Sequence, residues 1–258
     1  MTRAWPIAGT ALIALMLAAP AMAASPTVLI TDLSQARIDI NTTFKGADLL
    51  VFGAIQYPAG AVPDAPADIA IVVRGPVQPV IVREKSRVAG IWLNTDSVRF
   101  ESVPGFYAVA TTRPIDQLAD DRTTAIYEIG VGNLQLSPAS GDSEARTQRF
   151  ETGLIAAKRK ANLFVEDAGG VTLTQGVLYS ARIAIPAIVP VGEYAAEIHL
   201  IRKGRVIASS TTPIVIGKSG FERWIYVMAQ DHGLAYGFAA VAAALFAGWL
   251  ASVATRRR

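Results

Sequence analysis

Cysteine is absent from this 258-residue chain, and only two histidines are present. Without cysteine the protein cannot form disulfides, use a thiol nucleophile, hold zinc or iron–sulfur clusters through thiolates, or carry a c-type haem. The two histidines, His199 and His232, lie far apart in the sequence and do not form a metal-ligand motif. The composition therefore predicts a protein with no metal and no other cofactor.

Charged residues are also scarce: they make up 17% of the chain, against 52% hydrophobic residues. This composition excludes a disordered chain and is more apolar than that of an ordinary soluble enzyme. Between positions 24 and 230 there are 20 cations and 20 anions, so the net charge of +3 comes from the two ends. A neutral body lacks the basic surface that nucleic-acid binding requires.

Catalytic motifs are missing as well. The sequence contains neither a Gly-x-Ser-x-Gly elbow nor a phosphate-binding glycine loop. Asp120 and Asp121 are adjacent, and neighbouring residues on a helix do not face each other. His199 is expected on a solvent-exposed strand face together with Glu197, and His232 is expected to be a polar cap at a membrane edge. We therefore expect a protein that is not an enzyme.

The N-terminus has the layout of a secretory signal peptide. Arg3 precedes an apolar stretch at residues 8–19, Pro20 breaks the helix, and Ala21-Met22-Ala23 offers small residues at the cleavage positions. The alternative is an uncleaved anchor helix, but the apolar stretch is short for a membrane span. We expect residues 1–23 to be removed on export, with cleavage after Ala24 as the alternative site.

The C-terminus predicts a membrane span. Residues 234–254 are 21 uncharged residues with Tyr236 and Trp249 near the two ends, and about 20 apolar residues suffice to cross a bilayer. The alternative is a buried globular helix. Three arginines at 256–258 follow, and such clusters stay in the cytoplasm. We therefore expect a juxtamembrane segment at 220–233, a cytoplasmic tail at 255–258, and a body in the periplasm, anchored in the bacterial inner membrane.

Small residues recur every four positions along this segment, which lets a second helix approach closely. The partner would be a second copy of the chain or a multi-span membrane protein, whereas the plainer explanation is that alanine is common here. The residues of this packing stripe are Gly233, Gly237, Ala240, Ala244, Gly248 and Ser252.

Residues 24–112 have the pattern of a β-sandwich. Apolar and polar residues alternate over 38–45, as in a half-buried strand. Residues 49–55 form a continuous apolar run, which predicts a strand buried on both faces. Turn signals recur about every eight to twelve residues, which suggests an all-β sandwich. The Pro-x-Gly-x-Tyr entry at 190–194, followed by a hairpin, is common in immunoglobulin-like domains of bacterial envelopes.

The pattern becomes helical over residues 113–168. Short helices are expected after Pro114 and over 123–133, and a longer one after residues 140–143, with Phe150 and Leu154 on its apolar face. Strands return over 169–219. The hairpin there either joins the first sandwich or belongs to a second one, and we favour two small β modules with the helices between them.

Several ordered blocks resemble one known family. They are FKGADLLVFGAI at 44–55, VVRGP at 72–76, VAGIWLN at 88–94, FYAVA at 106–110, VPVGEY at 189–194, GFE at 220–222, AYG at 235–237 and GWLA at 248–251. From the signal peptide to the last arginine, the chain resembles the putative transmembrane protein family of alphaproteobacteria. Ala235 stands where the family pattern leads us to expect leucine. The resemblance implies an exported protein with one C-terminal anchor and no assigned reaction, associated with neighbouring permeases of the sulfite-exporter type.

Basic residues suggest one binding site. Arg83, Lys85 and Arg87 fall on one strand face by alternation, while Arg74 and Arg113 each close a neighbouring apolar strand. Arginine forks recognise oxyanions and carboxylates, so these five residues could hold an anion or an acidic loop of a partner. The alternative is a charged edge strand that prevents sheet pairing.

Two further expectations concern residues 92–97, which follow these basic residues in the chain. Trp92 is expected in the core, and residues 94–97 are expected to form a turn.

The sequence as a whole predicts a mainly β protein with inserted helices and one C-terminal transmembrane helix. We expect an accessory or interaction module for a membrane partner such as a transporter. A periplasmic anion-binding protein is the alternative.

Overall fold

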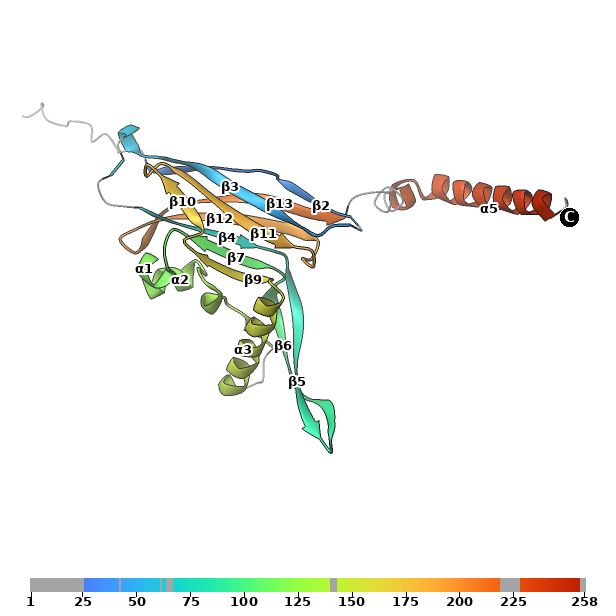
Figure 1. Cartoon of the computed structure of the whole chain (residues 1–258), viewed down its shortest axis with the longest axis horizontal. Coiled ribbons are helices and arrows are strands. Elements are labelled where there is room, and N and C mark those ends of the chain that lie inside the picture. Colours follow the sequence, from blue (N-terminus) through green and yellow to red (C-terminus); the bar gives the residue numbers. More distant parts are fainter. Residues whose placement is uncertain are drawn as a thin grey trace, which may run out of the picture.

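The computed structural model describes residues 26–41, 43–60, 62–63, 67–139, 143–218 and 228–255. The predicted signal peptide, most of the juxtamembrane segment and the three final arginines lie outside these residues. Figure 1 shows two sheets stacked on each other, helices and a long hairpin on one side of the stack, and a C-terminal helix that extends away from the body. The protein is mainly β with inserted helices.

The outer layer is a four-stranded antiparallel sheet. Its strands are β1 (Val28–Leu33), β3 (Gly46–Gln56), β11 (Leu178–Pro186) and β10 (Val171–Thr174), in that order across the sheet. In β3, Leu49, Val51 and Ile55 are buried, whereas Phe52 is exposed. The prediction that this run is buried on both faces is wrong, because no further layer covers the outer face of this sheet in the described residues.

Gly53 has a specific packing role within β3. It pairs with Thr31 on one side and Tyr179 on the other. The buried Tyr179 ring lies across the space that a side chain at position 53 would fill, and its hydroxyl lies 2.6 Å from the Thr31 hydroxyl. A Cβ atom added at Gly53 would lie 2.1 Å from the carbonyl oxygen of Ile30. Only glycine leaves room for this aromatic crossing.

The central layer is a six-stranded mixed sheet. In spatial order its strands are β2 (Arg37–Ile40), β13 (Arg205–Lys218), β12 (Gly192–Arg202), β4 (Asp68–Arg74), β7 (Tyr107–Thr111) and β9 (Phe164–Ala168). The β2–β13 and β7–β9 pairs are parallel, and the other pairs are antiparallel. The sheet therefore has one parallel pair at each edge.

Two cores lie on opposite faces of this central sheet. One fills the space between the two stacked sheets and includes Ile71 and Ile198. The other lies against the helices and the hairpin and includes Val72 and Val109. Because β4 and β7 contribute to both cores, every residue of β4 before Arg74 and every residue of β7 is buried.

The strand pairing decides how the two predicted β-rich segments are related. β11 pairs with β3 and β12 pairs with β4, so strands of 24–112 and of 169–219 share both stacked sheets. The later hairpin joins the first sandwich, and the prediction of two separate β modules is wrong. The immunoglobulin-like topology stays a prediction. The central sheet differs from the antiparallel sheets of that fold in its two parallel edge pairs.

Short helices cover part of the second core. α1 (Ile115–Leu118) follows Pro114, and α2 (Asp121–Ile126) begins where the Asp120 carboxylate accepts a 2.7 Å hydrogen bond from the Thr123 amide. The helix predicted at 123–133 is thus shorter and starts earlier. Glu128 and Gly130 have positive φ angles of 49° and 104° and end it, and a 3₁₀ turn, η2, follows at Val131–Asn133. A second 3₁₀ turn, η1, lies at Pro58–Gly60.

The longest helix of the body packs beside a projecting hairpin. α3 (Glu144–Lys160) buries Phe150 and Leu154, as its apolar periodicity predicts. The hairpin consists of β5 (Val77–Val88) and β6 (Ile91–Pro104), and β6 also pairs with the short β8 (Ser137–Pro138). In Figure 1 the hairpin extends well beyond the sheets, with α3 alongside its first half.

The C-terminal segment is helical. α5 (Gly233–Thr255) contains the predicted span and extends away from the body in Figure 1. Within the part of the chain that the structure describes, no helix is long and apolar enough to span a membrane.

Candidate functional site

The β5–β6 hairpin carries the basic residues that the sequence singled out. Arg83, Lys85 and Arg87 alternate along β5, and all three are exposed. Arg87 lies directly opposite Trp92 in the register, and Lys85 lies opposite Asn94, so these side chains share one face of the ribbon. We call Arg83, Lys85 and Arg87 the cationic face. None of them pairs with a carboxylate in the part of the chain that the structure describes.

The end of the same hairpin is apolar and exposed. Ala89 and Gly90 form the turn with φ angles of 49° and 89°, the signs that a two-residue type I′ turn requires. Beside it lie four exposed apolar side chains, which we call the apolar tip: Val88 (45% exposed), Ile91 (60%), Trp92 (69%) and Leu93 (44%).

Two predictions for this segment are wrong. Trp92 is not in the core, because the hairpin carries it beyond the covering helix. Residues 94–97 are not a turn either, because β6 runs through them with a register shift opposite Glu84 and Lys85. The chain instead turns at Ala89-Gly90.

Ion pairs join the opposite face of the hairpin to α3. The Asp96 carboxylate pairs with Arg146 and, at 3.1 Å, with Arg149, which also pairs with Glu84 at 3.1 Å. The hydrogen bond from Arg146 lowers the pKa of Asp96. The acidic side chains of the hairpin near α3 are therefore neutralised, which leaves the cationic face as its unpaired charge. Sequence reasoning missed this contribution of α3, because nothing local links Arg146 to a strand 50 residues earlier.

Arg74 belongs to a separate, partly buried cluster beneath α2. Its guanidinium donates to a Glu128 carboxylate oxygen at 2.6 Å and to the Tyr127 carbonyl at 2.9 Å, and it lies 3.3 Å from Glu197. Tyr107 donates its hydroxyl to the Glu128 carbonyl at 2.7 Å and accepts the Gly130 amide at 2.8 Å. Burial raises the pKa of Tyr107, so this hydroxyl stays protonated. These bonds fix the loop after α2 on the central sheet.

His199 lies in the same cluster and is buried, with 3% of its surface exposed. The prediction of a solvent-exposed histidine is wrong, although the strand face was assigned correctly: the loop after α2 covers that face, and the Tyr127 ring lies 4.9 Å from the imidazole. Neither ring nitrogen has a hydrogen-bond partner among the described residues. His199 Nε2 lies 3.6 Å from Glu197, and this neighbour is the main cause that lowers the pKa of Glu197, while burial acts in the opposite direction.

Arg113 lies at the other end of the β4–β7 pair. It forms an ion pair with Asp68, whose side chain is largely buried. Since Arg74 and Arg113 lie at opposite ends of paired strands and each holds a carboxylate, the structure does not gather all five predicted basic residues into one site. It brings together only Arg83, Lys85 and Arg87.

The packing stripe lies on α5. Gly233, Gly237, Ala240, Ala244, Gly248 and Ser252 are all exposed. A Cβ atom added at Gly233, Gly237 or Gly248 would meet no atom within 4 Å. His232 lies just before this helix and is exposed.

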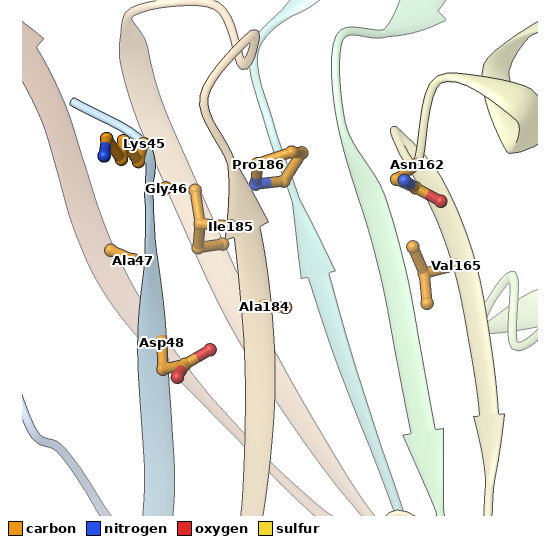
Figure 2. A pocket seen from close by; sticks show the side chains of 9 residues that line it. All are labelled: Lys45, Gly46, Ala47, Asp48, Asn162, Val165, Ala184, Ile185 and Pro186. Atoms are coloured by element: carbon orange, nitrogen blue, oxygen red, sulfur yellow. The ribbon is translucent and has the colours of Figure 1, made fainter. Parts of the chain in front are cut away.

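The grooves among the described residues of the body include the following three. The first, of about 460 Å³, is lined by the start of β3, the end of β11 and residues at or just before β9, among them Lys45, Asp48 and Asn162 (Figure 2). The second, also about 460 Å³, lies on the outer sheet and includes Ile30 and Phe52. Neither contains a predicted site residue.

The third groove, of about 320 Å³, separates the hairpin from α3. It is lined by Arg83 and Arg149 together with Phe150 and the small residues Gly153 and Ala157. A member of the cationic face thus also borders a groove. Within the described residues no group of three or more histidine and acidic side chains could hold a metal ion.

Comparison with known proteins places this sequence in a family. Residues 28–257 match the family described as putative transmembrane protein (Alph_Pro_TM). The chain belongs to this family. The match runs from the first strand of the sandwich to the second of the three C-terminal arginines, so it includes both the hairpin and α5. No curated protein and no solved structure matches the chain significantly. The family is one of transmembrane proteins by its description, and its function is not known.

Proposed function

We propose that the protein is a non-enzymatic module, exported and then anchored by residues 234–254, that presents its β-rich body in the periplasm to a membrane partner such as a transporter. The observation that carries this proposal is the exposure of large apolar side chains on α5. Leu234, Phe238 and Leu245 are 84%, 77% and 70% exposed. Contiguous apolar surface of this kind is costly in water and is typical of a helix that meets lipid or another protein.

The orientation follows from charge. Arginines at 256–258 favour the cytoplasmic side, and a signal peptide at residues 1–23 favours export of the body. External protease should therefore degrade the body in spheroplasts, and a chain that ends before residue 234 should be released from the membrane. A protected body, or a truncated chain that stays membrane-bound, would refute this topology.

The packing stripe is the surface that we assign to the partner helix. Ala244 lies on the stripe, whereas Ala243 lies off it and is also exposed. We expect Ala244→Leu to abolish co-purification of the partner in mild detergent, because leucine separates the two backbones. Ala243→Leu should leave it intact. A chain that is solitary and monomeric at native expression would contradict the proposal.

Oxyanion binding at the hairpin is the second candidate. It is favoured by Arg83, which is exposed without a carboxylate partner and lines the groove that also contains Arg149. Calorimetry on the detergent-solubilised full chain with sulfite, sulfate and phosphate would test it. Binding that Arg83→Gln removes and Arg99→Gln retains would support the candidate, since Arg99 already pairs with Glu101 at 2.8 Å. Absence of heat with all three anions would exclude it.

A further inference from the structure

The end of the β5–β6 hairpin combines two chemical features in a fixed order. The apolar tip, Val88 with residues 91–93, comes first, and it contains no charged residue. The cationic face follows along β5. With a rise of about 3.3 Å per residue, Lys85 lies about 10 Å behind Val88 and Arg83 about 16 Å behind it. In Figure 1 this end is the part of the body that lies farthest from the stacked sheets.

We propose that this hairpin end docks on an anionic lipid bilayer, with the apolar tip among the upper acyl chains and the cationic face against the lipid phosphates. The inference rests on the proposed function, because the C-terminal anchor would hold the body next to a membrane. It assigns the hairpin a lipid surface as its partner and leaves the packing stripe of α5 to a protein partner.

The order of the side chains matches the depth profile of a bilayer. Interfacial segments bury their apolar side chains about 5–10 Å into the boundary between headgroups and acyl chains, and tryptophan prefers this level. Trp92, which is 69% exposed, lies directly opposite Arg87, so the ring and the cation share one face. Arg87 is level with Trp92, whereas Lys85 and Arg83 lie behind the tip and reach the phosphate level when the tip is inserted.

Charge complementarity selects an anionic surface. The hairpin's acidic side chains Glu84 and Asp96 are already paired with α3, so the three cations act without compensation. Each cation near an anionic membrane surface contributes about fivefold in affinity, and three together contribute about 100-fold. An apolar protein groove would also accept Trp92, but it would not require one cation beside the ring and two more behind it along β5.

The test uses the absence of cysteine. A single Ala89→Cys substitution at the turn can be labelled with an environment-sensitive fluorophore on the full chain without background, and Lys203→Cys, at the exposed β12–β13 turn, gives a matched control label. Both proteins are reconstituted into vesicles of phosphatidylcholine alone or of equal parts phosphatidylcholine and phosphatidylglycerol. Brominated acyl chains serve as the quencher.

We expect the label at position 89 to shift to the blue and to be quenched in the anionic vesicles, while the label at position 203 stays in water. Replacing Arg83, Lys85 and Arg87 together by glutamine should reduce the ratio of inserted to exposed label about 100-fold. Replacing Arg83 and Arg87 by lysine should preserve it. All these positions are exposed, and unchanged thermal unfolding will show that the variants fold.

Three outcomes would overturn the proposal: a position-89 label that stays in water, insertion that the glutamine variant retains, or equal insertion of the control label. A blue shift that depends on protein density and not on phosphatidylglycerol would also overturn it, in favour of contact between copies. Alkaline carbonate extraction tests the C-terminal anchor independently of the hairpin. A chain that stays in the pellet with a water-exposed label refutes the hairpin docking alone, whereas a chain that is extracted refutes the anchor.

Discussion

β4 and the β5–β6 hairpin are neighbours in the chain, with two residues between them, yet they lie in opposite environments. Every residue of β4 before Arg74 is buried, whereas the apolar tip of the hairpin is 44–69% exposed. Both segments are rich in isoleucine and valine. The difference is the number of layers around them: β4 has a sheet on one face and helices on the other, and the hairpin leaves those layers behind. This exposed apolar group is the surface that we propose docks on a bilayer.

The sharpest test of this comparison uses one substitution at two isoleucines. Ile71 in β4 is fully buried and Ile91 at the tip is 60% exposed. Ile71→Ala should lower the free energy of unfolding by about 2–5 kcal/mol through lost burial and a cavity. Ile91→Ala should change it by no more than about 0.5 kcal/mol. Urea titration of the detergent-solubilised chain measures both, and equal losses would contradict the layer assignment.

Alanine substitutions at two glycines compare a crowded position with an open one. Gly53→Ala should destabilise by about 1–3 kcal/mol, because the new methyl would overlap the Ile30 carbonyl and the Tyr179 ring. Gly153 is an exposed position within α3 where an added Cβ meets nothing within 4 Å. Gly153→Ala should therefore stabilise by about 0.5–1 kcal/mol through helix propensity. Thermal unfolding reports both signs, and a tolerated Gly53→Ala would show that the tyrosine can move.

The buried charge cluster should respond to pH. The folded-state pKa of Glu197 is lowered, so its carboxylate contributes stability above the ordinary glutamate pKa of about 4.3 and loses it as the pH falls through the folded value. Glu197→Gln should cost about 1–2 kcal/mol at neutral pH, because Arg74 loses a charged partner. The difference from the parent chain should shrink below pH 4.3 or so.

An exposed pair provides the control for this experiment. Glu101 is about half exposed and pairs with Arg99 on the hairpin. Glu101→Gln should give a small difference that is nearly constant with pH, since surface pairs contribute little. A comparable pH dependence in both variants would indicate that the cluster around Glu197 is not specially stabilised.

The smallest effect is expected where the hairpin meets α3. Asp96→Asn removes the pairing with Arg146 and Arg149. Amide exchange in the outer half of β5 and β6 should accelerate, while global stability and exchange in β4 stay unchanged. Because the pKa of Asp96 is lowered chiefly by Arg146, acid should reproduce the effect in the parent chain once the carboxylate is protonated. High salt should weaken the difference, and slower exchange would contradict it.

Local patterns predicted the individual elements well. In β12, the prediction that Glu197 and His199 share one strand face is correct, and Tyr194 and Ile198 lie on the other face, in the core between the sheets. The apolar face of α3 and the helix after Pro114 are confirmed. Each of these depends on side-chain periodicity over a few turns or strand repeats, which the sequence contains directly.

Predictions about burial failed wherever a distant segment decides it. β3 has an uninterrupted apolar run but is buried on one face only, and His199 has the polar neighbours of a surface residue but is covered by the loop after α2. Of the five predicted basic site residues, Arg74 and Arg113 bind carboxylates, and only the three on β5 share a face. A signal for the hairpin was nevertheless present: an apolar run around Ala89-Gly90, preceded by alternating cations.

The sequence alone excluded thiol and disulfide chemistry, predicted most of the strands and helices, and showed that the C-terminal segment is uncharged and apolar. Composition and short-range periodicity contain that information because they depend on each residue and its close neighbours. Only the tertiary structure decided that the two β-rich stretches share both sheets, that β4 is enclosed and that Trp92 is exposed. Burial depends on pairing between strands more than a hundred residues apart, as between β4 and β12, and local pattern does not specify that pairing.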